Sequence, residues 1–207
     1  PVNSNVITVT VNSLPTITSQ PSSTVQNVCL NGSVSSLSVT ATGSGLTYQW
    51  YSNSTNSNAN GTLIAGATSS SYTPLVNATG TKYYYCVVSG TCAPAATSSV
   101  SGAVIVSSPT VGGSLSGSAT VCAGTNSTTF TLSGQTGSVI KWQSASNSGF
   151  TSNLTDLNYT STSYIASNLS STTYYRAVVA SGGCSSANST TGTVTVTAGS
   201  VGGTISG

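Results

Sequence analysis

Gln49-Trp50-Tyr51 and Tyr83-Tyr84-Tyr85-Cys86-Val87-Val88 return about 92 residues later as Lys141-Trp142-Gln143 and Tyr174-Tyr175-Arg176-Ala177-Val178-Val179. Around these segments, apolar and polar residues alternate in short runs such as Val6-Ile7-Thr8-Val9-Thr10-Val11 and Thr193-Val194-Thr195-Val196-Thr197. A period of two is typical of half-buried β-strands, and no long window has the period of a helix. The sequence therefore predicts an all-β protein that contains two copies of one domain.

The length of the repeat and the position of its tryptophan indicate the type of domain. A period of about 92 residues fits one immunoglobulin-like β-sandwich. Lys141 replaces Gln49, so this position should face solvent and the tryptophan beside it should face inward. By the same alternation, Tyr48 and Ile140 should also point inward.

A later strand gives a second pair of inward aromatic residues. Arg176 replaces Tyr85, which places both on the outer face, and their preceding neighbours therefore lie on the inner face. The sequence thus predicts tandem immunoglobulin-like sandwiches with four core anchors: Trp50, Tyr84, Trp142 and Tyr175.

The repeat also predicts the domain boundaries. The first domain should cover residues 14–107 and the second residues 108–198, joined at Ser107-Ser108-Pro109. Residues 1–13 have the pattern of the last strand of a preceding copy, and residues 199–207 that of the start of a following one. We therefore expect a segment of a longer tandem array, with neighbouring repeats of the same chain as partners and no direct membrane insertion.

Five cysteines fall into a repeated pattern. Equivalent positions and similar separations predict the pairs Cys29–Cys92 and Cys122–Cys184, and two bridges indicate an oxidising, extracellular location. Cys86 is left over as a free thiol, and Ala177 holds its place in the second copy. A reactive or intermolecular thiol is one interpretation. We favour a small buried hydrophobe, because cysteine is often fully buried.

The chain has very few groups for chemistry: no His, no Glu, one acid (Asp156) and three bases (Lys82, Lys141 and Arg176). Without imidazole or a second carboxylate there is no acid–base pair and no Ser–His or Cys–His unit. One Asp cannot supply the oxygen ligands of calcium. We expect no enzyme activity, no cofactor and no metal. Lys141 and Arg176 should share one sheet face, but two bases are too few to bind nucleic acid.

Several segments resemble repeats of giant Bacteroidota surface proteins. The resemblance is carried in the first copy by Val28-Cys29-Leu30-Asn31-Gly32, Leu46-Thr47-Tyr48-Gln49-Trp50-Tyr51-Ser52-Asn53 and Gly61-Thr62-Leu63-Ile64-Ala65-Gly66-Ala67-Thr68. In the second copy it is carried by Gly112-Gly113-Ser114-Leu115-Ser116-Gly117 and Val121-Cys122-Ala123-Gly124-Thr125. Such arrays occur in adhesins of gliding flavobacteria that are exported by type IX secretion. The resemblance implies an extracellular, cell-surface spacer and transfers no functional residue.

These observations predict a non-catalytic repeat module that acts as a stalk in a long adhesin or surface filament, in attachment or gliding. The alternative is a carbohydrate-binding module of a secreted protein, acting on surface glycans through outward aromatic residues such as Tyr51 and Tyr85. A neutral β-rich surface tends to associate through strand edges. Lateral self-association and glycosylation both remain open at this point.

Overall fold

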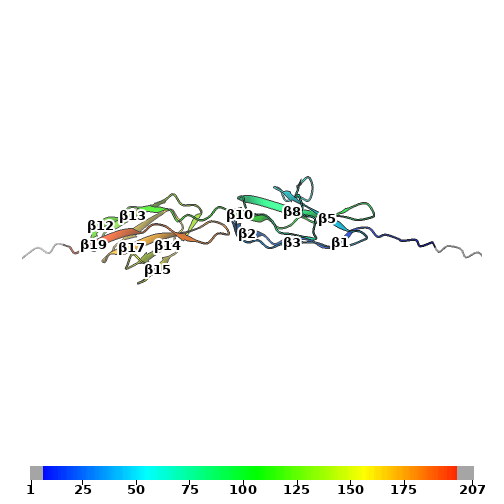
Figure 1. The fold of residues 1–207 in the computed structure, drawn as a ribbon. Coiled ribbons are helices and arrows are strands. Elements are labelled where there is room, and N and C mark those ends of the chain that lie inside the picture. The colour runs from blue at the N-terminus through cyan, green and yellow to red at the C-terminus, as the bar shows by residue number, and fades with distance from the viewer. Residues whose placement is uncertain (1–6, 200–207) are drawn as a thin grey trace, which may run out of the picture. The chain divides into compact units, whose positions relative to one another are not determined.

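The computed structural model describes residues 7–199 of the chain, and every regular element in this range is a β-strand (Figure 1). The predicted all-β class is therefore confirmed. The chain divides into two compact units, Pro1–Val106 and Ser107–Gly207, here called the first and second repeat. Their boundary lies one residue before the predicted one.

The first repeat is a sandwich of two layers. The larger sheet contains, in spatial order, β2 (Gln26–Cys29), β10 (Val104–Ser107), β8 (Gly80–Ser89), β5 (Thr47–Asn53) and β6 (Thr62–Leu63), with β9 (Ala96–Thr97) also paired to β8. The other layer consists of two strand pairs, β1 (Thr16–Ser19) with β4 (Thr40–Thr42) and β3 (Leu37–Ser38) with β7 (Ser71–Tyr72).

The second repeat has the same plan. Its larger sheet contains β12 (Ala119–Cys122), β19 (Gly192–Thr197), β17 (Thr173–Ala180), β14 (Ser138–Ala145) and β15 (Thr155–Leu157), with β18 (Ala187–Asn188) paired to β17. Its smaller sheet contains β11 (Ser114–Ser116), β13 (Ser127–Ser133) and β16 (Ser163–Ser167). Strand β12 runs parallel to β19. Along β13, Thr128, Phe130 and Leu132 are buried and their neighbours are exposed, so the period of two directly builds one half of a sandwich core.

Each repeat has its own hydrophobic core around its tryptophan. Trp50 and Trp142 are fully buried, and Tyr84 and Tyr175 are only 3% and 4% exposed. The four predicted anchor residues therefore all lie in a core. Both indole N–H groups donate to a backbone carbonyl oxygen at 2.9 Å, that of Ser69 in the first repeat and Ser161 in the second, so neither polar group is buried without a partner.

Strand β14 corrects one expectation. Its pairing with β17 shifts register between Val139 and Lys141, and such a bulge inserts an extra residue that reverses the alternation locally. Val139 is consequently buried at 6% exposure, while Ile140, which was predicted to point inward, is 47% exposed. Tyr48, on the regular strand β5, packs against the core of the first repeat as expected.

The predicted terminal strands lie partly outside the described residues, since 1–6 of the first and 200–207 of the second are not described. Residues 7–13 form no strand, and the alternating Ile7, Val9 and Val11 are all strongly exposed. In residues 7–199 we find no helix with the length and apolar character needed to cross a membrane.

Candidate functional site

The charged residues gather on one surface of the second repeat. Lys141 comes from β14, Asp156 from β15 and Arg176 from β17, and these include the single acid of the chain and two of its three bases. All lie on the side of the larger sheet that faces away from Trp142. This outer face is the candidate site because it holds most of the few charged side chains in the sequence.

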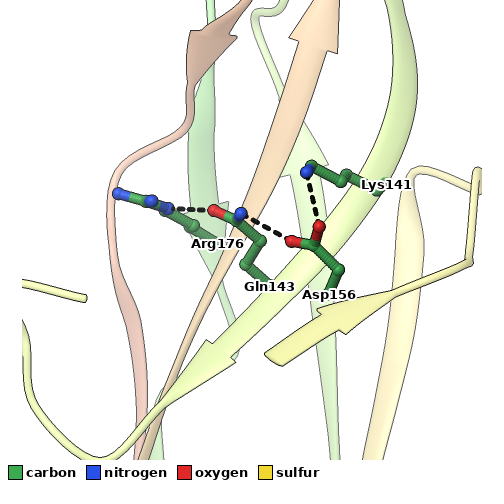
Figure 2. Close-up of polar contacts among 4 residues, drawn as sticks. All are labelled: Lys141, Gln143, Asp156 and Arg176. Atoms are coloured by element: carbon green, nitrogen blue, oxygen red, sulfur yellow. Dashed lines mark hydrogen bonds and ion pairs between the residues drawn. The ribbon is translucent and has the colours of Figure 1, made fainter. Parts of the chain in front are cut away.

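Four side chains form a continuous polar network across three strands (Figure 2). Lys141 Nζ lies 2.7 Å from Asp156 Oδ2, and Gln143 Nε2 donates to the other carboxylate oxygen at 2.7 Å. Gln143 Oε1 in turn accepts a hydrogen bond from Arg176 Nε at 2.7 Å. The register explains the contacts, because Gln143 lies directly opposite Asp156 on one side and Arg176 on the other. We call these four residues the network.

Phe150 completes the arrangement by covering the guanidinium group of Arg176. The Arg176 Cζ atom lies 4.1 Å from the centre of the Phe150 ring, a cation–π contact. Phe150 is 6% exposed although it belongs to a loop, and its φ of 55° is uncommon for a bulky residue. The loop is held by Asn147, whose Oδ1 accepts hydrogen bonds from the backbone N–H groups of Thr151 and Ser152.

The network keeps its carboxylate ionised. The hydrogen bond from Lys141 and then that from Gln143 lower the pKa of Asp156, and the nearby Lys141 and Arg176 charges act in the same direction. Both carboxylate oxygens are already engaged. Asp156 is thus suited to holding β15 against β14, whereas a general base would need a raised pKa and a free oxygen.

The equivalent surface of the first repeat carries different chemistry. Tyr51 and Tyr85 occupy the register positions of Gln143 and Arg176, and their rings stack at 5.1 Å with an interplanar angle of 6°. The hydroxyl of Tyr85 accepts a hydrogen bond from the Gly61 N–H at 3.0 Å, and Tyr85 is only 5% exposed. The proposed outward platform is corrected accordingly: Tyr85 is covered, and only Tyr51 keeps part of its surface accessible.

Cys86 is a free thiol that is fully buried in the first core. Burial raises the pKa of the Cys86 thiol to about 11, so it stays protonated and unreactive near neutral pH. Its backbone N–H donates to Ser98 Oγ at 2.9 Å, as that of Ala177 does to Ser189 Oγ. The thiol therefore occupies a site that a methyl group fills in the second repeat.

The other cysteines differ from the predicted pairs. Cys29 and Cys184 are disulfide-bonded, whereas Cys92 and Cys122 are free thiols. The pairs Cys29–Cys92 and Cys122–Cys184 are therefore corrected. The two cysteines of one copy do not lie close together, because the strands between them carry the chain to the opposite end of the sandwich.

The strand pairing of the first repeat shows this separation. Cys92 follows the end of β8, and its Sγ lies 3.5 Å from the carbonyl oxygen of Asn12, where the chain enters the repeat. Cys29 ends β2, which lies beside β10 at the point where the chain leaves the repeat. Strand β8 runs from one of these ends to the other, and its ten residues span about 30 Å. A disulfide joins Cα atoms that are at most about 7 Å apart, so Cys29 and Cys92 cannot form one.

The sequence missed two members of the candidate site and predicted its location. Lys141 and Arg176 were expected on one sheet face, and they are on it. The sequence analysis did not single out Gln143, although the expected pairing of neighbouring strands places it beside their charged residues. Phe150 had no detectable signal, because its position depends on the left-handed turn of a single loop residue.

A protein-family model described as "Domain of unknown function (DUF8696)" matches residues 18–107 and again residues 111–198. No curated protein matches the chain significantly. Among solved structures, immunoglobulin domains 1–4 of Sidekick-1 are similar over 90% of the chain with 16% identity and a TM-score of 0.54. The chain spans about half of that structure, 49%. Murine CEACAM1b is similar over 88% of the chain and 100% of its own length, with 16% identity and a TM-score of 0.51. These likenesses show an immunoglobulin-like fold.

Proposed function

Since the chain belongs to the family described as Domain of unknown function (DUF8696), as two successive copies of its domain, we propose that it is a non-catalytic stalk segment of a long extracellular adhesin or surface filament. Each copy supplies a folded spacer, and a series of copies holds a binding end away from the cell. In the finer form of this proposal, the parent protein is a cell-surface adhesin of gliding Bacteroidota exported by type IX secretion, as the sequence resemblance implies.

The observation that carries the proposal is the contrast between core and surface. The two repeats share the buried tryptophan, its hydrogen bond to a carbonyl and the buried serine behind the second anchor strand. At the centre of the outer face they differ: the first repeat has a tyrosine stack and the second has the network. Repetition has kept what makes a sandwich stable and has not kept a common ligand site, which is the pattern expected of a spacer.

A glycan array with the purified chain tests the proposal against the carbohydrate-binding alternative. We expect no saturable binding, because Tyr85 is buried beneath the segment that contains Gly61 and has no exposed ring face. Saturable glycan binding that Tyr51→Ala removes, and that the exposed control substitution Ile165→Ala in the second repeat leaves intact, would replace the stalk with a carbohydrate-binding module.

Stretching a single molecule in the presence of reductant supplies the positive test. A chain of two independently folded spacers should unfold in two events, each releasing about 30 nm, the contour length of roughly 90 residues. A single event, or gradual extension without a force peak, would contradict the proposal.

A further inference from the structure

The segment that leads into the first repeat carries the most exposed apolar side chains of residues 7–199. Ile7, Val9 and Val11 are 86%, 79% and 88% exposed. They alternate with two threonines in residues 7–11, here called the entry segment, which precedes β1 and forms no strand (Figure 1). Such an alternation of β-branched apolar and polar residues favours a β-strand that buries one face. The entry segment therefore has the composition of a strand, but its apolar face lies in solvent.

The last strand of each repeat shows where a strand of this kind is buried. In the second repeat β19 lies between β12 and β17, parallel to the first and antiparallel to the second. Val194 on this strand is fully buried in the core, and the outward Thr195 is exposed. In the first repeat β10 holds the same place between β2 and β8. A copy without its last strand would therefore have a gap in its larger sheet, with a strand to pair with on each side.

A glycine restricts the register of a strand in this place. Gly192 lies two residues before the buried Val194, and a Cβ atom at Gly192 would lie 2.5 Å from a ring atom of Phe130. In the first repeat Gly102 precedes the buried Val104 by the same two residues, and backbone atoms crowd the position of its missing Cβ. A large side chain therefore does not fit two residues before the buried valine.

We propose that the entry segment is a last strand whose partner is another copy of the same domain, one that lacks its own last strand. It enters the larger sheet of that copy between the strands equivalent to β12 and β17, where main-chain hydrogen bonds form on both sides. Ile7 takes the place of Val194 and Val9 that of Val196, because a shift by two residues would put either Ile7 at the glycine or Asn5 in the core. The inference does not depend on the stalk proposal, since it concerns the pairing of one strand.

A nicked full chain tests the proposal. The recognition sequence of a site-specific protease is inserted after the exposed Thr191, just before β19, and the folded chain is cleaved there. The product is unfolded in urea and refolded with a synthetic peptide of residues 6–13 in about a hundredfold excess, so that mass action favours the peptide. Native mass spectrometry identifies what is bound. We expect the peptide to replace fragment 192–207 in most molecules, as a peptide of residues 192–199 should.

Two matched peptides distinguish strand insertion from unspecific binding. Ile7→Asp puts a charge on the inward face and should reduce capture at least about tenfold, because an unpaired charge is costly to bury. Thr8→Asp puts the same charge on the outward face and should leave capture unchanged. The proposal is overturned if only the peptide of residues 192–199 is captured, or if both substitutions reduce capture equally. It also fails if neither parent peptide is captured, since the sheet then accepts no strand at this place.

Discussion

Trp50 and Trp142 combine complete burial with a hydrogen bond across the sandwich, to a carbonyl 19 residues further along in both repeats. In both repeats the indole thus fastens a central strand of the larger sheet to a carbonyl at the same place in the chain. In the first repeat Tyr72 packs against the indole at a ring distance of 6.0 Å, and in the second Tyr164 does so at 5.2 Å.

Replacing either tryptophan should therefore unfold its own repeat first. Trp50→Ala and Trp142→Ala should each lower the unfolding free energy of their repeat by about 3–5 kcal/mol, the usual cost of emptying a large aromatic site. Denaturant unfolding followed by residue-resolved NMR measures each repeat separately. The control Ile140→Ala, at an exposed position, should change stability by less than about 0.5 kcal/mol. An unchanged midpoint in either tryptophan variant would place that indole on the surface.

Cys86 makes the first repeat more sensitive to alkali than the second. Its native pKa of about 11 lies above its value in the unfolded chain, so the unfolded state releases the proton first. The associated stability is complete below the unfolded pKa and is lost as pH rises through the native one. The loss should begin near the reference pKa of a thiol, about 8.5.

The substitution Cys86→Ala, which installs the residue of the second repeat, should delay this loss. The next groups with raised pKa values are Tyr84 and Tyr175, each raised to about 12 by burial and by a neighbouring tyrosine. In the variant, stability of the first repeat should hold until about pH 10, the reference value for tyrosine. Urea midpoints between pH 7 and 11 measure the difference. If both proteins lose stability at the same pH, the thiol is not the titrating group.

At the scale of the elements, the network fastens the edge strand β15 to the centre of its sheet. Its ion pair is exposed, with side-chain exposures of 32% for Lys141 and 50% for Asp156, and such pairs contribute little to global stability. Its effect is on register. Gln143 can bond to Asp156 only when the two residues lie opposite each other, so slippage of β15 would break the contacts of Asp156 with both Gln143 and Lys141.

The lowered pKa of Asp156 predicts an acid dependence that belongs to the second repeat alone. Because the native pKa lies below the unfolded value near 3.9, the stabilising effect is present above that value and is lost as pH falls through the native pKa. Asp156→Asn should remove this dependence. Lys141→Gln introduces the residue that the first copy has at this position. It should weaken the acid dependence and leave the hydrogen bond from Gln143 to Asp156 in place. Amide exchange in β15 between pH 2 and 5 is the measurement, and equal slopes in all three proteins would exclude Asp156 as the cause.

How far the elements could be predicted depends on whether strand alternation was regular. On β5, β8 and β17 the inward and outward assignments from the sequence place Trp50, Tyr84 and Tyr175 correctly. On β14 the bulge exchanged Val139 and Ile140, and no residue in that segment marks a bulge in advance. Phe150 was missed for a related reason, since a loop conformation and not a pattern brings it over Arg176.

At the scale of the whole molecule, the cysteines show why a repeat in the sequence does not determine its cross-links. Equal separations in two copies indicate that the arrangement is the same in each copy. They do not show whether the two cysteines of a copy lie at the same end of the sandwich. That depends on the number and direction of the strands between them. Cys29 and Cys92 lie at opposite ends of the sandwich. The alternation of residues predicts which side chains face inward, but it does not predict this strand register.

The scarcity of charge predicts how the whole molecule responds to its solvent. Stability changes with pH only where the folded and unfolded states bind different numbers of protons. The chain has no His and no Glu. Its clearly shifted groups are Asp156, which is lowered, and Cys86 and four tyrosines, which are raised. None of these titrates between about pH 4.5 and 8.

The unfolding free energy of both repeats should consequently be constant within about half a kcal/mol across that range. Raising the ionic strength from low to physiological should change it equally little, because one exposed ion pair, Lys141–Asp156, is the only one in residues 7–199 that salt can screen. Urea unfolding at several pH values and two salt concentrations measures both effects. A slope above about one kcal/mol across the range would require a further titrating group, such as an acidic glycan on the surface. A spacer whose unfolding free energy does not change with pH or salt keeps its fold in water of changing acidity and salinity, as the proposed stalk would have to do.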